Sequence, residues 1–364
     1  MSDFVTPPPL EPGNRVAVVG PSSGGARNAP HVFELGLQRL RERFDLEPVV
    51  YPTARQGDRF LAANPRARAA DIHDAFEDPD IAGVVATIGG SDQLRVLDYL
   101  DPERLRAHPT RFYGMSDNTN IQLLLWTAGL VSYNGAQLMN ELGVPGELPA
   151  YTETHCRRAF FDDRLGELTP AERWTDEPST WWTDPTELAT PPTYEPNPGW
   201  RWAGTTQAVE GRLWGGNRTV VEWHLATDRY LPGPAALDGA VLCLETAESI
   251  PQPEAVRGTL LCLGERGLLA RFDGVLVGRP PTRSFLTEPP GSSVRPTASG
   301  CTRLSSRRLA GTIRLRRSCW GWTGGTPPRP HRSRWVAVSG STRTPRPFGA
   351  GSRLRRGVVP DGLV

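Results

Sequence analysis

Apolar runs and helical periodicities alternate along the first part of the chain. Short apolar runs closed by turn residues indicate buried parallel strands, and they lie at residues 14–24, 47–52, 81–90, 111–114 and 129–135. Apolar residues recur at helical spacing at residues 31–44, 65–80 and 91–101, and again in the stretch that ends at Gly129. This alternation predicts an α/β fold, with a doubly wound parallel sheet in an N-terminal domain over residues 1–165.

The alternation fails over residues 166–204, which are rich in proline, threonine, acids and tryptophan. We interpret this segment as a connecting loop, because a long irregular stretch in a compact protein is either functional or a linker. Residues 205–288 then predict a smaller C-terminal α/β domain. It has a strand, a glycine turn and a helix at residues 208–228, and buried strands at residues 239–249 and 272–281.

Composition changes again at residue 289. Residues 289–364 hold 15 arginines and a single acid, Asp361, whereas the whole chain has a net charge of +1. Such a tail could be a basic arm for nucleic acid or a membrane surface. It lacks interleaved aromatic residues and helical periodicity, so we expect neither partner and treat the tail as aberrant and outside the C-terminal domain, which it leaves incomplete.

The apolar runs, the N-terminal sequence and the cysteines argue against several classes of protein. No apolar run reaches the length of a membrane span, and the N-terminus does not resemble a signal peptide, so we expect a soluble cytoplasmic protein. Five scattered cysteines form no CxxC pair and no Cys/His ligand spacing. We therefore expect no disulfide framework and no structural zinc site, and no motif indicates a cofactor.

The stretch RFYGMSDNTNIQLLLWTAG at residues 111–129 is the first that indicates chemistry. Ser116 follows a predicted strand and precedes a predicted helix, at the edge of a parallel sheet where ligands bind. A Gly-x-Ser turn in this place can expose a serine nucleophile, and the next N–H can stabilise an oxyanion. The alternative is a helix cap, which is the commoner use of serine before a helix.

Four motifs follow one another along the chain, and their order and spacing are informative. They are residues 71–101, YGMSDNT at 113–119, GRLWGGN at 211–217 and CLETAE at 243–248. Together they resemble the LD-carboxypeptidase family of serine peptidases, including its microcin-immunity branch, over residues 13–285. The resemblance implies a metal-free, usually dimeric enzyme with a Ser-His-Glu triad in the cleft between two domains.

The resemblance also implies roles for individual residues. Ser116 matches the nucleophile, and Glu245 matches the carboxylate that orients the histidine. The backbone at Gly90 and Asp117 matches the oxyanion hole, and Asn217 matches a loop that borders the substrate. Each residue also has a purely structural alternative, and Glu248 could replace Glu245.

Two tryptophans in the connecting loop, Trp181 and Trp182, resemble the aromatic residues of the microcin-immunity branch that contact a nucleotide-like part of the substrate. A flat indole face suits stacking on a base. The alternative is that buried tryptophans only fix the loop. On this basis a peptidyl- or aminoacyl-nucleotide is preferred over a murein L,D-peptide as the substrate.

The chain departs from the family at the catalytic histidine, which the family carries in a Gly-His-Thr-type motif near the C-terminus. After Glu245 the sequence contains one histidine, His331, in a proline-rich stretch, and His224 precedes Glu245. We interpret residues 289–364 as the product of a shifted reading frame. Val338–Pro345 can be encoded so that the frame two bases later reads Leu-Gly-Val-Asp-Pro-His-Thr.

Two hypotheses about function follow from this departure. The first is a serine carboxypeptidase or amidase that cleaves an amide next to a free carboxylate and is active when the C-terminus carries its histidine. The second is a hydrolase-like protein that binds such peptides without turnover. We expect the 364-residue chain as printed to be inactive or nearly so.

Overall fold

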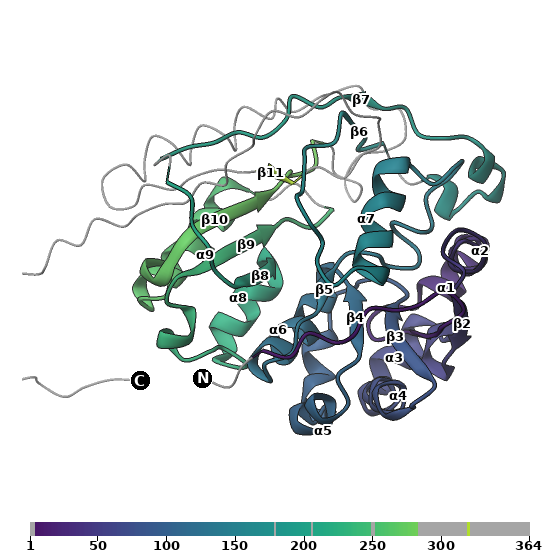
Figure 1. Cartoon of the computed structure of the whole chain (residues 1–364), viewed down its shortest axis with the longest axis horizontal. Coiled ribbons are helices and arrows are strands. Elements are labelled where there is room, and N and C mark those ends of the chain that lie inside the picture. The colour runs from purple at the N-terminus through teal and green to yellow at the C-terminus, as the bar shows by residue number, and fades with distance from the viewer. Residues whose placement is uncertain (1–3, 178–179, 205–206, 249–251, 283–318, 321–364) are drawn as a thin grey trace, which may run out of the picture.

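The computed structural model describes residues 4–177, 180–204, 207–248, 252–282 and 319–320. The first sheet has five strands in the order β2-β1-β3-β4-β5, and every neighbouring pair is parallel. Its strands are β1 (Arg15–Val19), β2 (Glu47–Val50), β3 (Ile81–Ala86), β4 (Arg111–Gly114) and β5 (Tyr133–Asn134). The expected α/β fold with a parallel sheet is therefore confirmed (Figure 1).

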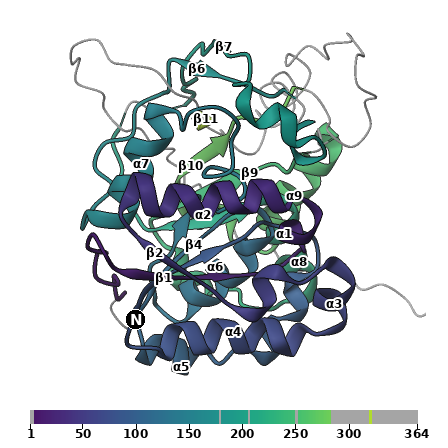
Figure 2. The same ribbon diagram turned by 90° about the vertical axis from the view of Figure 1, so that its right-hand side faces the viewer.

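Helices cover both faces of this sheet. They are α1 (Gly25–Asn28), α2 (Pro30–Phe44), α3 (Asp58–Ala63), α4 (Pro65–Glu77), α5 (Pro102–Ala107), α6 (Thr119–Thr127) and α7 (Ala150–Phe161). Figure 2 shows α2 across one side of the strands, with α4 and α5 on the other. Because both faces are covered, β1 is an almost continuous apolar run rather than an alternating one.

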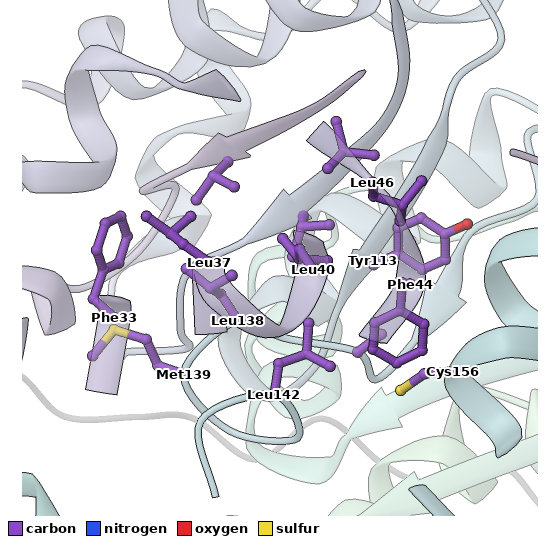
Figure 3. Packing of buried hydrophobic residues seen from close by; sticks show 14 of the residues in the cluster. Phe33, Leu37, Leu40, Phe44, Leu46, Tyr113, Leu138, Met139, Leu142 and Cys156 are labelled. Carbon is purple, nitrogen blue, oxygen red and sulfur yellow. The ribbon is translucent and has the colours of Figure 1, made fainter. Parts of the chain in front are cut away.

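Two apolar clusters fill the space between the sheet and its helices. The cluster under α2 contains Phe33, Leu37, Leu40 and Phe44, which recur at helical spacing and contact the side chains of Leu138, Met139 and Leu142 (Figure 3). The cluster on the opposite face joins α4, α5 and α6 to the strands. The helical periodicity of residues 31–44 therefore marks the face that α2 buries.

The second sheet is also parallel, in the order β11-β10-β9-β8. Its elements are β8 (Leu213–Asn217), α8 (Arg218–Thr227), β9 (Ala240–Glu245), α9 (Pro253–Glu265), β10 (Phe272–Gly278) and β11 (Cys319–Trp320). A third apolar cluster lies here and includes Leu123 of α6. Helix α6 thus contributes side chains to the cores of both domains.

The segment between the sheets is irregular, as its composition predicts. It contains one antiparallel pair of two-residue strands, β6 (Arg173–Trp174) and β7 (Glu195–Pro196), and two short 3-10 turns at Thr180–Trp182 and Pro185–Ala189. Figure 1 shows it running along the top of the molecule from α7 to the second domain.

Three sequence predictions differ from the structure. Residues 91–101 form two 3-10 turns, Gln93–Arg95 and Leu97–Tyr99, instead of one helix, because Asp101 is extended before a proline and caps α5. The expected glycine turn before α8 is wrong as well: the strand β8 continues through both glycines, and the helix begins directly after Asn217. The strand expected at residues 129–135 shortens to Tyr133–Asn134.

The glycines of β8 are needed where the two domains meet. Gly216 has a φ of +137°, and a Cβ atom there would lie 2.6 Å from the hydroxyl oxygen of Thr119 on α6. The next residue, Asn217, donates its backbone N–H to the same hydroxyl at 3.0 Å. A side chain at position 216 would therefore separate β8 from the helix that follows the serine turn.

Candidate functional site

Ser116 occupies a strained turn between β4 and α6. Met115 is extended, and Ser116 then takes a φ of +60° as the first residue of a 3-10 turn that continues to Asn118. A left-handed serine costs of order 1 kcal/mol and persists where the surrounding structure holds it in place. Since Asn118 is the residue that precedes α6, Ser116 is not the cap of that helix.

Glu245, the last residue of β9, lies directly against this turn. The backbone N–H of Ser116 donates to Glu245 Oε1 at 3.3 Å, and the Asn134 side chain donates to Oε2 at 3.4 Å. Burial raises the pKa of Glu245, and these two hydrogen bonds oppose the rise. The structure thus brings together a serine from the first sheet and a carboxyl from the second.

Asp117 is buried, and its carboxyl group holds the loops around the turn. Its Oδ2 accepts hydrogen bonds from the hydroxyl of Ser22 and from the backbone N–H groups of Asp92 and Gln93. Burial raises the pKa of Asp117, while the hydrogen bond from Ser22 opposes the rise. The side chain therefore positions the backbone next to Ser116, where the resemblance implies an oxyanion-binding N–H.

A glycine pair follows β3 and lies against the same turn. A Cβ atom on Gly89 would lie 2.9 Å from the Cβ of Ser116, and one on Gly90 would lie 2.4 Å from the hydroxyl oxygen of Ser22. Gly89 therefore lets the loop approach the serine closely, and Gly90 does the same for the loop at Ser22. The resemblance implied a role for Gly90, whereas Gly89 is the glycine that lies against Ser116.

A buried arginine supports the loop that carries these glycines. Arg68 on α4 is fully buried, and its guanidinium donates to Asp92 at 2.8 Å and to the carbonyl of Pro21 at 3.3 Å. The backbone N–H of Asp92 also donates to the carboxyl group of Asp117. The arginine thus joins three segments that surround Ser116.

Asn217 lies beside Glu245, since the two residues are partners in the register of β8 and β9. Its amide oxygen accepts from the N–H groups of Thr219 and Val220, so it caps α8. The side chain is almost completely buried. The structure therefore gives Asn217 a helix-capping contact in addition to its place next to Glu245.

Trp181 and Trp182 lie in the 3-10 turn at Thr180–Trp182 and are half-buried against the cluster under α2. The carbonyl of Trp181 lies 2.5 Å from the Nε2 of His31, at the start of α2. Both tryptophans thus help to fix the connecting loop on the first domain. This contact fits the structural alternative, and a stacking role remains a prediction.

Glu141 is a residue of the site that the sequence did not single out. Its Oε2 accepts from the N–H of Gln137 at 2.8 Å, and the Gln137 side chain donates to the carbonyl of Met115, next to Ser116. Burial raises the pKa of Glu141 to about 7, and the charge of Glu245 adds to the rise. No periodicity or motif marks this residue, because its burial depends on a loop folding back over the sheet.

Three histidines of the described residues make contacts elsewhere. His73 accepts from the N–H of Asp101 at 3.0 Å, and His155 lies 2.8 Å from the carbonyl of Tyr151. His224 lies 3.0 Å from the side chain of Asn120 and 2.7 Å from the carbonyl of Arg229. His331 lies outside the described residues, as does the tail at 289–364 apart from Cys319–Trp320. In the described ranges, no three His, Cys, Asp or Glu side chains gather as a metal site would require.

Comparison with known proteins assigns the chain to a family. Residues 16–135 match the LD-carboxypeptidase N-terminal domain, and residues 210–293 match the LD-carboxypeptidase C-terminal domain. The chain is thus a two-domain α/β protein of the carboxypeptidase class, and it belongs to the LD-carboxypeptidase family. No helix in the part that the structure describes has both the length and the apolar character to cross a membrane.

The chain is similar to a murein carboxypeptidase and to proteins of the microcin-immunity kind. The murein tetrapeptide carboxypeptidase of Pseudomonas aeruginosa is 30% identical over 64% of this chain and 66% of its own length. The microcin C7 self-immunity protein MccF of Escherichia coli is 25% identical over 65% and 67%. The structure of an MccF-like protein from Streptococcus pneumoniae in complex with AMP has a TM-score of 0.73 and 26% identity, and covers 87% of this chain and 92% of its own.

Proposed function

We propose that the chain carries the site of a serine carboxypeptidase or amidase, with Ser116 as the nucleophile and Glu245 as the carboxylate of a Ser-His-Glu triad. The observation that carries the proposal is the contact between the strained Ser116 turn and Glu245 at 3.3 Å, because the two groups come from different sheets. A serine in an unfavourable backbone conformation beside a buried carboxyl is typical of an activated nucleophile.

The mechanism follows from the positions of these groups. A histidine held by Glu245 takes the proton of the Ser116 hydroxyl, and the oxygen attacks the carbonyl carbon of the scissile amide. The N–H groups at Gly90 and Asp117 stabilise the oxyanion. The histidine then gives its proton to the leaving amine, and water releases the acyl group from Ser116 as a carboxylic acid.

The preferred substrate is a peptidyl- or aminoacyl-nucleotide, with a murein L,D-peptide as the alternative. Structures of MccF in complex with aspartyl sulfamoyl adenosine and with glutamyl sulfamoyl guanosine share this fold. Trp181 and Trp182 supply indole rings for stacking on a base. The identity to the murein tetrapeptide carboxypeptidase supports the alternative.

The missing histidine and the tail have one explanation in this proposal. The match to the C-terminal family domain ends at residue 293, close to residue 289, where the arginine-rich composition begins. A shifted reading frame from this point replaces the strand that carries the histidine. Without an imidazole, Ser116 stays a neutral alcohol and the leaving amine has no proton donor, so turnover falls to the small rate that oxyanion donors alone provide.

The experiment compares the 364-residue protein with a variant, the restored chain, in which the gene is read in the alternative frame after residue 288. Each is incubated with aspartyl sulfamoyl adenosine and with an L,D-tetrapeptide, and products are measured by mass spectrometry. We expect turnover only in the restored chain, and its loss by several orders of magnitude in Ser116→Ala with binding largely kept. Unchanged turnover in that variant would eliminate Ser116 as the nucleophile.

Further outcomes separate the alternatives. Cleavage of the tetrapeptide but not of the nucleotide analogue reverses the substrate preference. Binding of either compound without turnover in the restored chain supports a binding protein. Normal turnover by the printed chain that disappears in His331→Ala would show that the tail itself supplies the base, against the proposal.

A further inference from the structure

A buried chain of hydrogen bonds joins the serine turn to the second domain. Asn120 on α6 and His224 on α8 are both fully buried. The side-chain amide of Asn120 donates to the backbone carbonyl of Asp117 at 2.8 Å and to its carboxylate at 2.9 Å. On its other side, the Asn120 carbonyl oxygen lies 3.0 Å from His224 Nε2.

The orientation of Asn120 fixes the direction of these bonds. Its NH₂ group faces two oxygens of Asp117, so a flipped amide would bring its own oxygen against a carboxylate. The oxygen of Asn120 must therefore face His224, and an oxygen accepts. The Nε2 atom of His224 has to carry a proton for this contact to be favourable.

The other ring nitrogen also faces an acceptor. His224 Nδ1 lies 2.7 Å from the carbonyl of Arg229. Arg229 belongs to a turn in which Asp228 and Tyr230 both have positive φ, at +52° and +50°. Burial lowers the pKa of His224, which favours the neutral ring with a single proton. Because the Asn120 amide is held from its far side by two acceptors, we infer that this proton is on Nε2, which leaves Nδ1 facing the carbonyl of Arg229 without one.

The turn after α8 is itself attached to the first domain. The guanidinium of Arg229 pairs with Asp98, and the hydroxyl of Tyr230 donates to the carbonyl of Leu97 at 3.0 Å. Two contacts therefore join the turn after α8 to the 3-10 turn at Leu97–Tyr99. The ring is held where it can transmit a displacement of either domain.

We propose that Asn120 and His224 are positioning residues, through which the second domain holds Asp117 and thereby the backbone of the serine turn. Asp117 receives two hydrogen bonds from one amide, and that amide keeps its orientation because His224 donates to it. Loss of the bond from His224 leaves the Asn120 oxygen buried without a donor, which weakens its hold on Asp117. The catalytic meaning of this hold rests on the proposed function, whereas the bridge itself does not.

The experiment uses two substitutions, each of which places an amide nitrogen near the position of one ring nitrogen. His224→Gln places an amide donor close to the Nε2 position, and His224→Asn places one close to the Nδ1 position. Hydrogen exchange is measured on the full printed chain, in a peptide covering residues 113–119 and in a control peptide covering residues 47–51. We expect exchange in the first peptide to rise about tenfold in His224→Asn, the equivalent of one lost hydrogen bond, and to stay near wild type in His224→Gln.

A merely structural histidine gives a different result. It would raise exchange around residues 225–231 equally in both variants and leave residues 113–119 unchanged, which would overturn the proposal. The wild-type chain supplies a second measurement should His224→Asn not fold. Long-range ¹⁵N–¹H spectra of the His224 ring at pH 7.5 should show the proton on Nε2, and a proton on Nδ1 alone would equally overturn it. Neither readout requires turnover, so failure of the proposed enzyme activity leaves the bridge open to test.

Discussion

Replacing Glu141 by glutamine should stabilise the protein in alkaline solution but not in acid. The pKa of Glu141 rises from 4.5 to about 7 on folding, because the carboxyl is buried and Glu245 lies nearby. Between these two values the folded state binds more protons than the unfolded state, so stability falls as pH rises. Well below pH 4.5 both states are protonated and the penalty disappears.

The magnitude follows from the pKa difference. The pKa difference of about 2.5, at 1.36 kcal/mol per pKa unit, lowers the free energy of unfolding by at most about 3 kcal/mol above pH 8. Glutamine keeps an oxygen for the N–H of Gln137 and carries no charge, so Glu141→Gln removes the penalty. Replacement of the exposed Glu147 by glutamine is the matched control in the same loop.

Denaturant unfolding followed by tryptophan fluorescence measures this prediction at pH 5 and pH 8. We expect Glu141→Gln to exceed wild type by about 1 kcal/mol or less at pH 5 and by up to about 3 kcal/mol at pH 8, with Glu147→Gln unchanged at both. An equal difference at the two pH values would refute the reasoning. It would mean that Glu141 ionises as it does in water.

Three further substitutions test the contacts around the serine. Ser116→Gly should raise the free energy of unfolding by about 1 kcal/mol relative to Ser116→Ala, because glycine accepts the positive φ without strain; equal stability of the two variants would contradict this. Arg68→Met should lower it by about 1–3 kcal/mol, since Asp92 and the carbonyl of Pro21 lose a buried donor, and a neutral effect in thermal unfolding would show that water replaces the arginine. Gly216→Ala should lower it by about 2 kcal/mol or more, and an unchanged melting temperature would mean that β8 moves away from Thr119 at little cost.

Much of the fold could be predicted because it depends on local patterns. The strands at Arg15–Val19 and Phe272–Gly278 are apolar runs, and the helix at Pro30–Phe44 has apolar residues at helical spacing. The segment at 91–101 also has helical spacing, but the proline at its end and the hydrogen bonds to Asp117 decide its conformation. Such competition between local and distant contacts is invisible in one sequence.

The candidate site was predictable in part. Ser116 and Glu245 come from motifs whose order resembles a family, and the structure brings them into contact. Glu141 and the pair Asn120–His224 carry no motif, since their roles depend on which side chains meet when two domains pack. Asn217 shows the opposite case, because its motif was visible and its capping contact was not.

Helix α6 determines how the site responds to motion. Its first turn follows Ser116, Leu123 packs in the second domain, and the Trp126 ring N–H donates to the carbonyl of Leu213 at 2.9 Å. A rotation of the second domain would therefore pivot about this helix, and points on a pivot move least. Small rotations of the second domain would therefore leave the distance between Ser116 and Glu245 nearly constant.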